Sequence, residues 1–257
     1  MSFPYKHVLL VGATSGIGLA LAERLVKECK VTVVGRRREL LDDFVAKHGS
    51  NAQAATFDLS DLEKAPQFAA DVMKANPDID CVFLNAGFQQ YEDWTKPEAV
   101  DIPGFRSTID INFISFVILT KEFLPYLSAK KEKTSIIYTT SNLAIVPAVM
   151  MSSYSASKAA LNAFILCLRD DLSNSSVNIV ELLPPLVQTP IHSLSGPDGK
   201  QLGMPLDEFT EKAYAGLCSS EDSVYIGDDH LGEPILNVMT QRRAVFEGMA
   251  TVVKSLR

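Results

Sequence analysis

Short apolar runs rich in β-branched residues alternate with longer segments of helical period along the chain. The short runs read HVLLVG, VTVVG, AATFD, DCVFLNAG, SIIYTTS, VNIVELL and SVYIG. The helical patterns lie near residues 16–29, 38–48, 61–75, 104–127, 153–173, 206–218 and 231–255. Because the apolar runs are continuous rather than alternating, they suit a parallel sheet covered on both faces. Strand–helix repetition with short links predicts an α/β fold with a doubly wound, seven-stranded parallel sheet.

The whole chain, residues 1–257, is expected to form a single domain. It is 47% hydrophobic and 21% charged, and no linker rich in proline, glycine or serine divides it. The net charge of −7 argues against a nucleic-acid surface. The most apolar segment, IDINFISFVILTKEFLPYL, is expected to be too short and too polar to span a bilayer. Scattered cysteines and histidines indicate reduced thiols and no metal site. We therefore expect a cytoplasmic protein without nucleic-acid or membrane partners.

Three glycines follow the first apolar run, in the sequence VLLVGATSGIGLALAERL. They lie between a predicted strand and a predicted helix, where a tight turn needs residues without a Cβ. The helix start offers free N–H groups and the positive end of its dipole to a pyrophosphate. The sequence therefore predicts a Rossmann-type dinucleotide site at this turn. Its contacts are expected from Gly12, Thr14, Ser15, Gly16, Ile17 and Gly18.

The second apolar run ends at Gly35 and is followed by three arginines. A chain that selects NAD places an acidic side chain at this point, where it binds the adenosine ribose. Arg36 and Arg37 can instead bind a 2′-phosphate, which favours NADP (NADPH when reduced) over NAD. The alternative is a solvated basic helix start, although cations oppose the helix dipole there. The sequence predicts NADP as the cofactor.

The third and fourth runs end in two further groups that are expected to contact the nucleotide: Asp58 and Leu59, and then Asn85, Ala86 and Gly87. Asp58 could reach an adenine amino group or cap the next helix, although Ser60 or Asp61 suits a cap better. Small residues after Asn85 let the backbone pass close to a ribose. The Asn85 amide could at the same time tie two strands together.

The stretch SSYSASKAALNAF places Tyr154 and Lys158 one helical turn apart. The pair could be one aromatic residue and one solvated charge on a helix face. It could also be a proton-transfer pair, because a nearby ammonium favours the phenolate and lowers the tyrosine pKa from about 10 toward neutrality. Small neighbouring residues would let this helix approach both the sheet and a cofactor. Together with the motifs above, the pattern favours the catalytic interpretation.

The motifs VGATSGIG, LNAG and SSYSASK, in this order, resemble the short-chain dehydrogenase/reductase family over residues 7 to about 190. The resemblance implies an enzyme that transfers a hydride between nicotinamide and a carbonyl or secondary alcohol. It also implies four catalytic residues: Asn112, Ser141, Tyr154 and Lys158. Tyr154 would be the acid/base, and Lys158 would assist it and hold the nicotinamide ribose. Ser141 would bond the substrate oxygen, and Asn112 would hold a proton-relay water.

The segment LLPPLVQTP departs from the family pattern. Pro184 matches, Pro185 replaces a glycine, and Thr189 takes the place of a threonine that contacts the nicotinamide amide. Because proline has no N–H, position 185 cannot donate a hydrogen bond. The Val187 N–H and the Thr189 hydroxyl remain as expected contacts. The proline- and glycine-rich loop that follows leaves the end of a predicted strand, so we expect a substrate lid over about 186–222.

The remaining sequence features bear on the oligomeric state, the substrate and the alternative functions of the protein. The helices at 104–127 and around ALNAFILCL are apolar on more than one face, so a homodimer or homotetramer is expected. Phe88, Tyr91 and Trp94, with His192 and Met204, suggest a partly aromatic pocket for a small-molecule substrate, although Phe88 and Trp94 could equally pack beneath a loop. Two alternative functions are a catalytically silent NADP-binding sensor and a lyase or epimerase of the same family.

Overall fold

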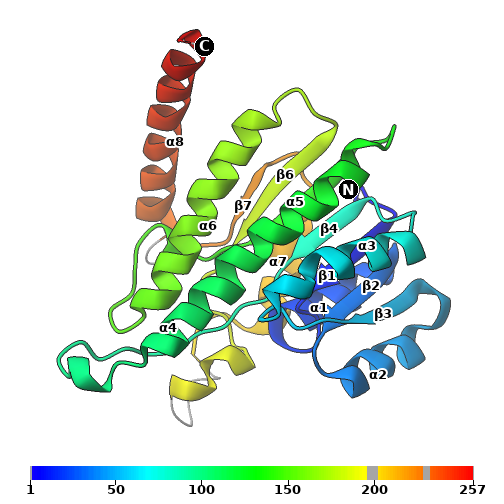
Figure 1. Ribbon diagram of the computed structural model, residues 1–257, viewed down its shortest axis with the longest axis horizontal. Coiled ribbons are helices and arrows are strands. Elements are labelled where there is room, and N and C mark those ends of the chain that lie inside the picture. The colour runs from blue at the N-terminus through cyan, green and yellow to red at the C-terminus, as the bar shows by residue number, and fades with distance from the viewer. Residues whose placement is uncertain (1, 196–201, 228–231, 257) are drawn as a thin grey trace.

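Seven parallel strands form the centre of the computed structural model, which describes residues 2–195, 202–227 and 232–256 (Figure 1). The strands are β1 (His7–Val11), β2 (Lys30–Gly35), β3 (Ala52–Thr56), β4 (Cys81–Leu84), β5 (Thr134–Thr139), β6 (Val177–Leu183) and β7 (Ser223–Tyr225). Their order in the sheet is β3-β2-β1-β4-β5-β6-β7. The predicted doubly wound, seven-stranded parallel sheet in a single domain is confirmed. The third strand begins and ends two residues before the predicted AATFD segment.

The strand order reverses beside β1, which pairs with β2 on one side and β4 on the other. Val8 lies opposite Val31 of β2 and Cys81 of β4. At such a reversal the connections leave toward opposite faces of the sheet, so a crevice opens at the carboxyl ends of the strands. One face is covered by α1 (Gly16–Leu25), α2 (Arg38–His48) and α7 (Leu206–Leu217), the other by α3 (Ala65–Ala75), α5 (Ser115–Ser128) and α6 (Ser152–Asp171).

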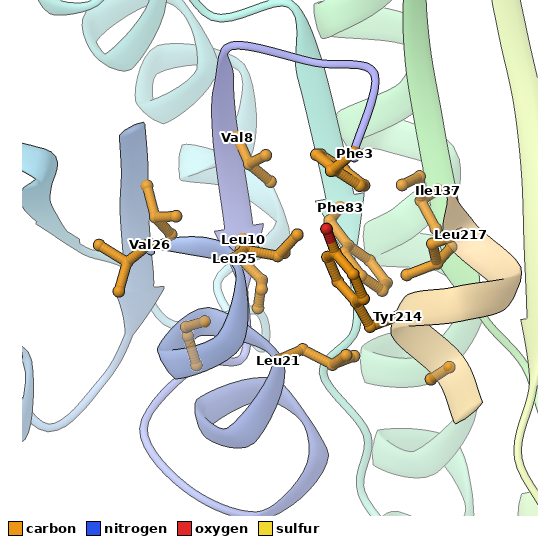
Figure 2. Packing of buried hydrophobic residues seen from close by; sticks show 14 of the residues in the cluster. Phe3, Val8, Leu10, Leu21, Leu25, Val26, Phe83, Ile137, Tyr214 and Leu217 are labelled. Atoms are coloured by element: carbon orange, nitrogen blue, oxygen red, sulfur yellow. The ribbon is translucent and has the colours of Figure 1, made fainter. Parts of the chain in front are cut away.

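Alternate residues of β1 supply both halves of the core. Figure 2 shows Val8 and Leu10 on the face that packs against α1 and α7, with Leu21 and Tyr214 among their neighbours. Leu9 belongs to the opposite cluster, beneath α3, α5 and α6. Successive side chains of a strand point to opposite faces, and burying each large apolar side chain contributes about 1.5–3 kcal/mol. Both layers therefore hold the strand ends, and with them the crevice, in a fixed place.

The helix predicted at 104–127 is a longer composite. It consists of α4 (Ile102–Ile109), a π turn at Asp110–Ile114, and α5. By length and composition, Ile102–Ser128 is apolar enough to cross a membrane, so the expectation that this segment is too short and too polar was wrong. Here Phe116, Leu119 and Phe123 are fully buried in the core. In this fold one face of the run packs in the core, and its π turn breaks the ordinary helical register.

The C-terminal part adds two elements near the ends of β6 and β7. Residues after β6 form a short bridge from Val187 to Met204 and a 3-10 turn at Pro190–Ser195. Positions 196–201 of the predicted lid lie outside the described residues. The last helix, α8 (Gly232–Ser255), runs past α6 and extends away from the sheet (Figure 1). Arg243 fastens it to Asp222 by two hydrogen bonds of 2.7 Å.

Candidate active site

A cleft of about 870 Å³ runs along the carboxyl ends of the strands. Its walls come from the turn after β1, the ends of β2 to β6, and the start of α6. Every predicted cofactor-binding or catalytic residue except Asn112 lines this cleft, and Asn112 lies buried beside it. Of the residues expected in the substrate pocket, Phe88, Tyr91 and His192 line the cleft, whereas Trp94 and Met204 do not. The fold therefore brings the predicted nucleotide residues and the predicted catalytic residues into one continuous space.

The glycine turn is shaped by close backbone contact. Gly12 has a φ of +87°, and a Cβ there would lie 2.5 Å from the Cα of Ala86. A Cβ at Gly18 would lie 2.0 Å from the Gly12 carbonyl oxygen. Helix α1 begins at Gly16, and the Ser15 side chain does not cap it. The N–H groups of the first helical turn remain available to an anion, as a dinucleotide pyrophosphate requires.

The arginines after β2 meet this turn. Arg37 Nη2 donates hydrogen bonds to Thr14 Oγ1 at 2.6 Å and to Ser15 Oγ at 2.9 Å. Arg36 pairs with Asp58 at 3.6 Å, and both side chains are largely exposed. A Cβ at Gly35 would lie 2.5 Å from Thr14 Cγ2. An acidic side chain at position 35 would therefore clash with the Thr14 side chain. The guanidinium groups of Arg36 and Arg37 line the cleft next to this position.

Asp58 and Asn85 have structural partners as well. Asp58 Oδ1 accepts hydrogen bonds from the N–H and the hydroxyl of Ser60. Partial burial acts to raise the pKa of Asp58, but the bonds from Ser60 and the charge of Arg36 outweigh it and leave the pKa lowered. Asn85 accepts from Thr139 Oγ1 at 2.9 Å and donates to the Gly12 carbonyl at 3.4 Å. The Asn85 amide thus ties the end of β5 to the glycine turn.

Tyr154 and Lys158 project from one face of α6 into the cleft. Ser141, which follows β5, lies beside Tyr154 in the cleft, and its side chain acts to lower the pKa of the Tyr154 hydroxyl. Lys158 is 1% exposed, and its Nζ donates to the Thr139 carbonyl at 2.9 Å. The same Nζ lies 5.7 Å from the centre of the Tyr154 ring. The structure therefore brings Ser141, Tyr154 and Lys158 together at one point.

The pKa values of this pair differ from the expectation. Burial raises the pKa of Tyr154 to about 12, although the side chain of Ser141 acts in the opposite direction. Burial also lowers the pKa of Lys158 to about 7, against the charge of Glu181, which raises it. The predicted lowering of the tyrosine pKa was wrong for the protein alone. Desolvation disfavours both charged forms, and a half-neutral lysine supplies only part of the expected charge.

Asn112 occupies the π turn between α4 and α5. Its Oδ1 accepts from the Phe88 N–H at 2.7 Å, and its Nδ2 donates to the Phe88 carbonyl and to Ser157 Oγ. These bonds satisfy an amide that would be costly to bury alone. At Gly87, the place where a Cβ would stand lies 4.0 Å from both Asn112 Oδ1 and Lys158 Nζ. The missing side chain leaves this point, near both groups, open.

Sequence reasoning missed the group that caps α6. Glu92, in the loop after β4, is 2% exposed and accepts hydrogen bonds from the hydroxyls of Ser152 and Ser153 and from the Ser153 N–H. Burial acts to raise the pKa of Glu92, but the bonds from Ser153 and Ser152 prevail and lower it. The two serines begin α6 and present their donors to a carboxylate 60 residues earlier, which no local pattern reveals.

The residues after β6 close the far wall. Thr189 packs against Gly16, with its Cβ 3.4 Å from where a Gly16 side chain would begin. Pro184 accepts a hydrogen bond from the Asn142 N–H through its carbonyl. Val187 is buried, and its backbone bonds the His192 ring, whose pKa is lowered by burial. The predicted contacts Val187 and Thr189 therefore face the same cleft as Tyr154.

Comparison with known proteins identifies the family and several relatives of this chain. The family model for short chain dehydrogenases matches residues 6–198. The chain is 32% identical over 228 residues to the uncharacterized oxidoreductase DltE of Bacillus subtilis (strain 168), covering 87% of this chain and 89% of that protein. It is 33% identical over 184 residues to serine 3-dehydrogenase of Rhizobium radiobacter, covering 71% of this chain and 72% of that protein.

Similarity extends to a solved structure. The short chain dehydrogenase of Burkholderia cenocepacia J2315, in complex with NADP, superposes with a TM-score of 0.78 at 25% identity. The match covers 97% of this chain and 99% of that chain. The residues that the family model matches, 6–198, include the glycine turn and the helix that carries Tyr154.

Proposed function

Because the chain belongs to the short-chain dehydrogenase family, we propose that it is an NADP-dependent oxidoreductase acting on a carbonyl or a secondary alcohol. The observation that carries this proposal is the meeting of Ser141, Tyr154 and Lys158 in the cleft that begins at the glycine turn. Bound NADPH supplies a hydride to a carbonyl carbon, and NADP accepts one in the reverse direction.

Tyr154 is the group proposed to move the proton. In carbonyl reduction its hydroxyl donates to the substrate oxygen, and the Ser141 hydroxyl holds that oxygen by a second hydrogen bond. A phenol with a pKa of about 12 is a stronger donor to an oxyanion than to a neutral carbonyl. The charged form of Lys158 stabilises the phenolate that remains. The two hydroxyls thus favour the negative oxygen of the transition state over the ground state.

Asn112 is proposed to support proton return to Lys158. Its amide donors are already used by Phe88 and Ser157, so a relay water would donate to its Oδ1. The space beside Gly87, 4.0 Å from that oxygen and from Lys158 Nζ, suits one water molecule. A larger residue at position 87 would fill this space.

The preference for NADP rests on Arg36 and Arg37. Both line the cleft next to Gly35, where a carboxylate that selects NAD would clash with Thr14. A 2′-phosphate placed there would meet two guanidinium groups and compete with Asp58 for Arg36. The similar solved structures include complexes with NADP and with NADH, so the choice between them rests on these arginines.

The substrate is proposed to be an uncharged carbonyl with an apolar substituent. Around Ser141 and Tyr154 the cleft is lined by Leu143, Val146, Pro147, Ala148, Met151, Ile191, Leu202 and Ile235. Among the described residues of this end, only Lys158 carries an ammonium, guanidinium or carboxylate group. An amino acid such as serine would need partners for its own charges, and burying them unpaired is costly. An aliphatic or aromatic ketone or aldehyde fits better.

A homodimer or homotetramer is expected from partly exposed apolar side chains on the helical run 102–128. Ile102 and Tyr126 are largely exposed, and Ile114 and Val117 are half-buried. Light scattering on protein leaving a size-exclusion column, at several concentrations, tests this expectation. A monomer at every concentration would contradict it.

The proposed activity is tested by two measurements on the pure protein. Fluorescence titration should show NADPH binding at least tenfold tighter than NADH. Oxidation of NADPH should then be followed across a panel of neutral ketones and aldehydes, with serine and short keto acids as charged comparisons. Turnover of apolar carbonyls, absent in Tyr154→Phe, supports the proposal. Tight NADPH binding without turnover of any carbonyl or alcohol would indicate a nucleotide sensor instead.

A further inference from the structure

A buried carboxylate lies next to the catalytic residues without being one of them. Glu181 of β6 is 1% exposed. Its Oε1 accepts a hydrogen bond from Thr140 Oγ1 at 2.7 Å. Asn162 Nδ2 donates to both of its oxygens, at 2.9 and 3.1 Å. These two donors favour the ionised form of the carboxylate, which accepts and does not donate, although burial leaves the pKa of Glu181 raised.

The spacing along α6 places this carboxylate beside the site. Tyr154, Lys158 and Asn162 follow one another at intervals of four residues, so they form one stripe of the helix. Glu181 lies in register with Tyr138 of β5, whose ring packs in the cluster beneath α5 and α6. The Glu181 side chain therefore points to the face that carries Lys158, one turn along from it.

Three consecutive residues at the end of β5 each hold a different part of this arrangement. The Thr139 carbonyl accepts from Lys158 Nζ. The Thr140 hydroxyl donates to Glu181, and the Ser141 side chain lies beside Tyr154 in the cleft. Glu181 therefore holds the residue that stands between the neighbours of Lys158 and Tyr154.

We propose that Glu181 is a positioning residue for this site: its buried carboxylate fixes the β5 end that carries Thr140 and Ser141, and it balances the ammonium charge of Lys158. The residue does not touch the substrate or the cofactor. It acts through the lysine and through the strand end.

The charged groups around Glu181 come from two elements. Arg169 and Lys158 belong to α6, and Arg242 belongs to α8. Burial raises the pKa of Glu181, while the bonds from Asn162 and Thr140 and the two arginines lower it. Arg169 is in turn balanced by Asp222. Lys158 itself is faced by Glu181 and by the phenol of Tyr154.

The outermost member of the network lies on the last helix. Arg242 Nη1 donates to Asn162 Oδ1, which orients the amide so that its NH₂ group points to Glu181. Helix α8, which Figure 1 shows extending from the body of the protein, thereby contributes a charge to the active-site side of α6. The order of contact runs from Arg242 through Asn162 and Glu181 to Thr140.

The test is the titration of Lys158 in the protein without cofactor. Lysine labelled with ¹³C at Cε is followed by NMR as a function of pH, and the Lys158 signal is assigned with Lys158→Arg. In Glu181→Gln the midpoint is expected to fall by about one pH unit from its value near 7, because removal of a negative charge disfavours the ammonium. Thr140→Val should shift it in the same direction by a smaller amount.

Glu23→Gln is the matched control. It removes a partly buried carboxylate that accepts hydrogen bonds from Lys47 and His48 between α1 and α2, on the opposite face of the sheet from Glu181. Its melting temperature should fall while the Lys158 midpoint stays unchanged. A folded Glu181→Gln protein with an unchanged midpoint would overturn the proposal. Should Glu181→Gln fail to fold, an unchanged midpoint in Thr140→Val would overturn it equally.

Turnover gives a second, separate readout. The link from Glu181 to catalysis rests on the proposed oxidoreductase function. Glu181→Gln is expected to lower kcat about tenfold and to leave the KM for NADPH unchanged. If the wild-type protein reduces no carbonyl, the proposed function fails, while the lysine titration still decides the role of Glu181.

Discussion

The two ends of the cleft are built in different ways. At the nucleotide end, Gly12 and Gly18 bring backbone against backbone, and no side chain could be added without displacing main-chain atoms. At the substrate end, side chains from separate segments form the wall, and several are half exposed, among them Val146 and Leu202. The first end fixes where a cofactor lies through main-chain geometry. The second can change its lining while the sheet stays the same.

The largest expected effect lies at the junction of the two ends. Tyr154→Phe removes the proton donor and leaves the ring packing in place. The rate kcat/KM for carbonyl reduction should fall by about 10³-fold or more, with NADPH affinity and melting temperature close to wild type. Steady-state kinetics and fluorescence titration measure the two quantities. Activity within tenfold of wild type would rule out Tyr154 as the acid.

Two substitutions test the contrast between the ends: one adds a side chain at the nucleotide end, and the other shortens a side chain at the substrate end. Gly12→Ala places a Cβ on a residue with φ of +87° and within 2.7 Å of Ala86 atoms, so it should lower the free energy of unfolding by about 2–4 kcal/mol. Val146→Ala, at a side chain that is 48% exposed, should cost less than about 1 kcal/mol. Urea unfolding of both variants checks this order. Equal losses of unfolding free energy in the two variants would contradict the proposed difference between the two ends of the cleft.

Cofactor choice should respond only at the nucleotide end. Arg36→Asp with Arg37→Ala is expected to weaken NADPH binding by about 10- to 100-fold and to leave NADH binding nearly unchanged. Titration with each nucleotide measures the ratio. Arg38→Ala, in the same basic run but paired with Asp42, is the control. Equal losses for both nucleotides would refute a 2′-phosphate site.

An effect comparable in free energy to the change in NADPH affinity is expected in the pH dependence of stability. The pKa of Lys158 is about 7 when folded and 10.5 when exposed, so between these values the unfolded chain binds more protons. The free energy of unfolding therefore increases as pH rises through that window. Below the window, burial of Lys158 destabilises the folded protein by its full amount. From pH 7 to pH 9 the gain is about 2 kcal/mol. It should be missing in Lys158→Met, as urea unfolding at both pH values would show.

Much of the fold follows from local sequence. The predicted limits of β6 and α2 agree with the structure residue for residue, because apolar runs and basic helix starts are read within a few positions. The residues gathered in the cleft could be predicted because each follows a strand, and parallel strands end at one edge. What could not be predicted depends on distant partners. Glu92 reaches α6 from 60 residues away, and burial reverses the expected pKa of Tyr154.

The loop between β4 and α4 is held at two places, by Asn112 on the backbone of Phe88 and by Glu92 on the start of α6. Its second fastening also restrains the helix that presents Tyr154. The loop between these two attachment points is therefore a segment that can be exchanged to widen the mouth of the cleft. Exchanges that keep both attachment points should alter which molecules enter, whereas a deletion that removes either would loosen the proton donor itself.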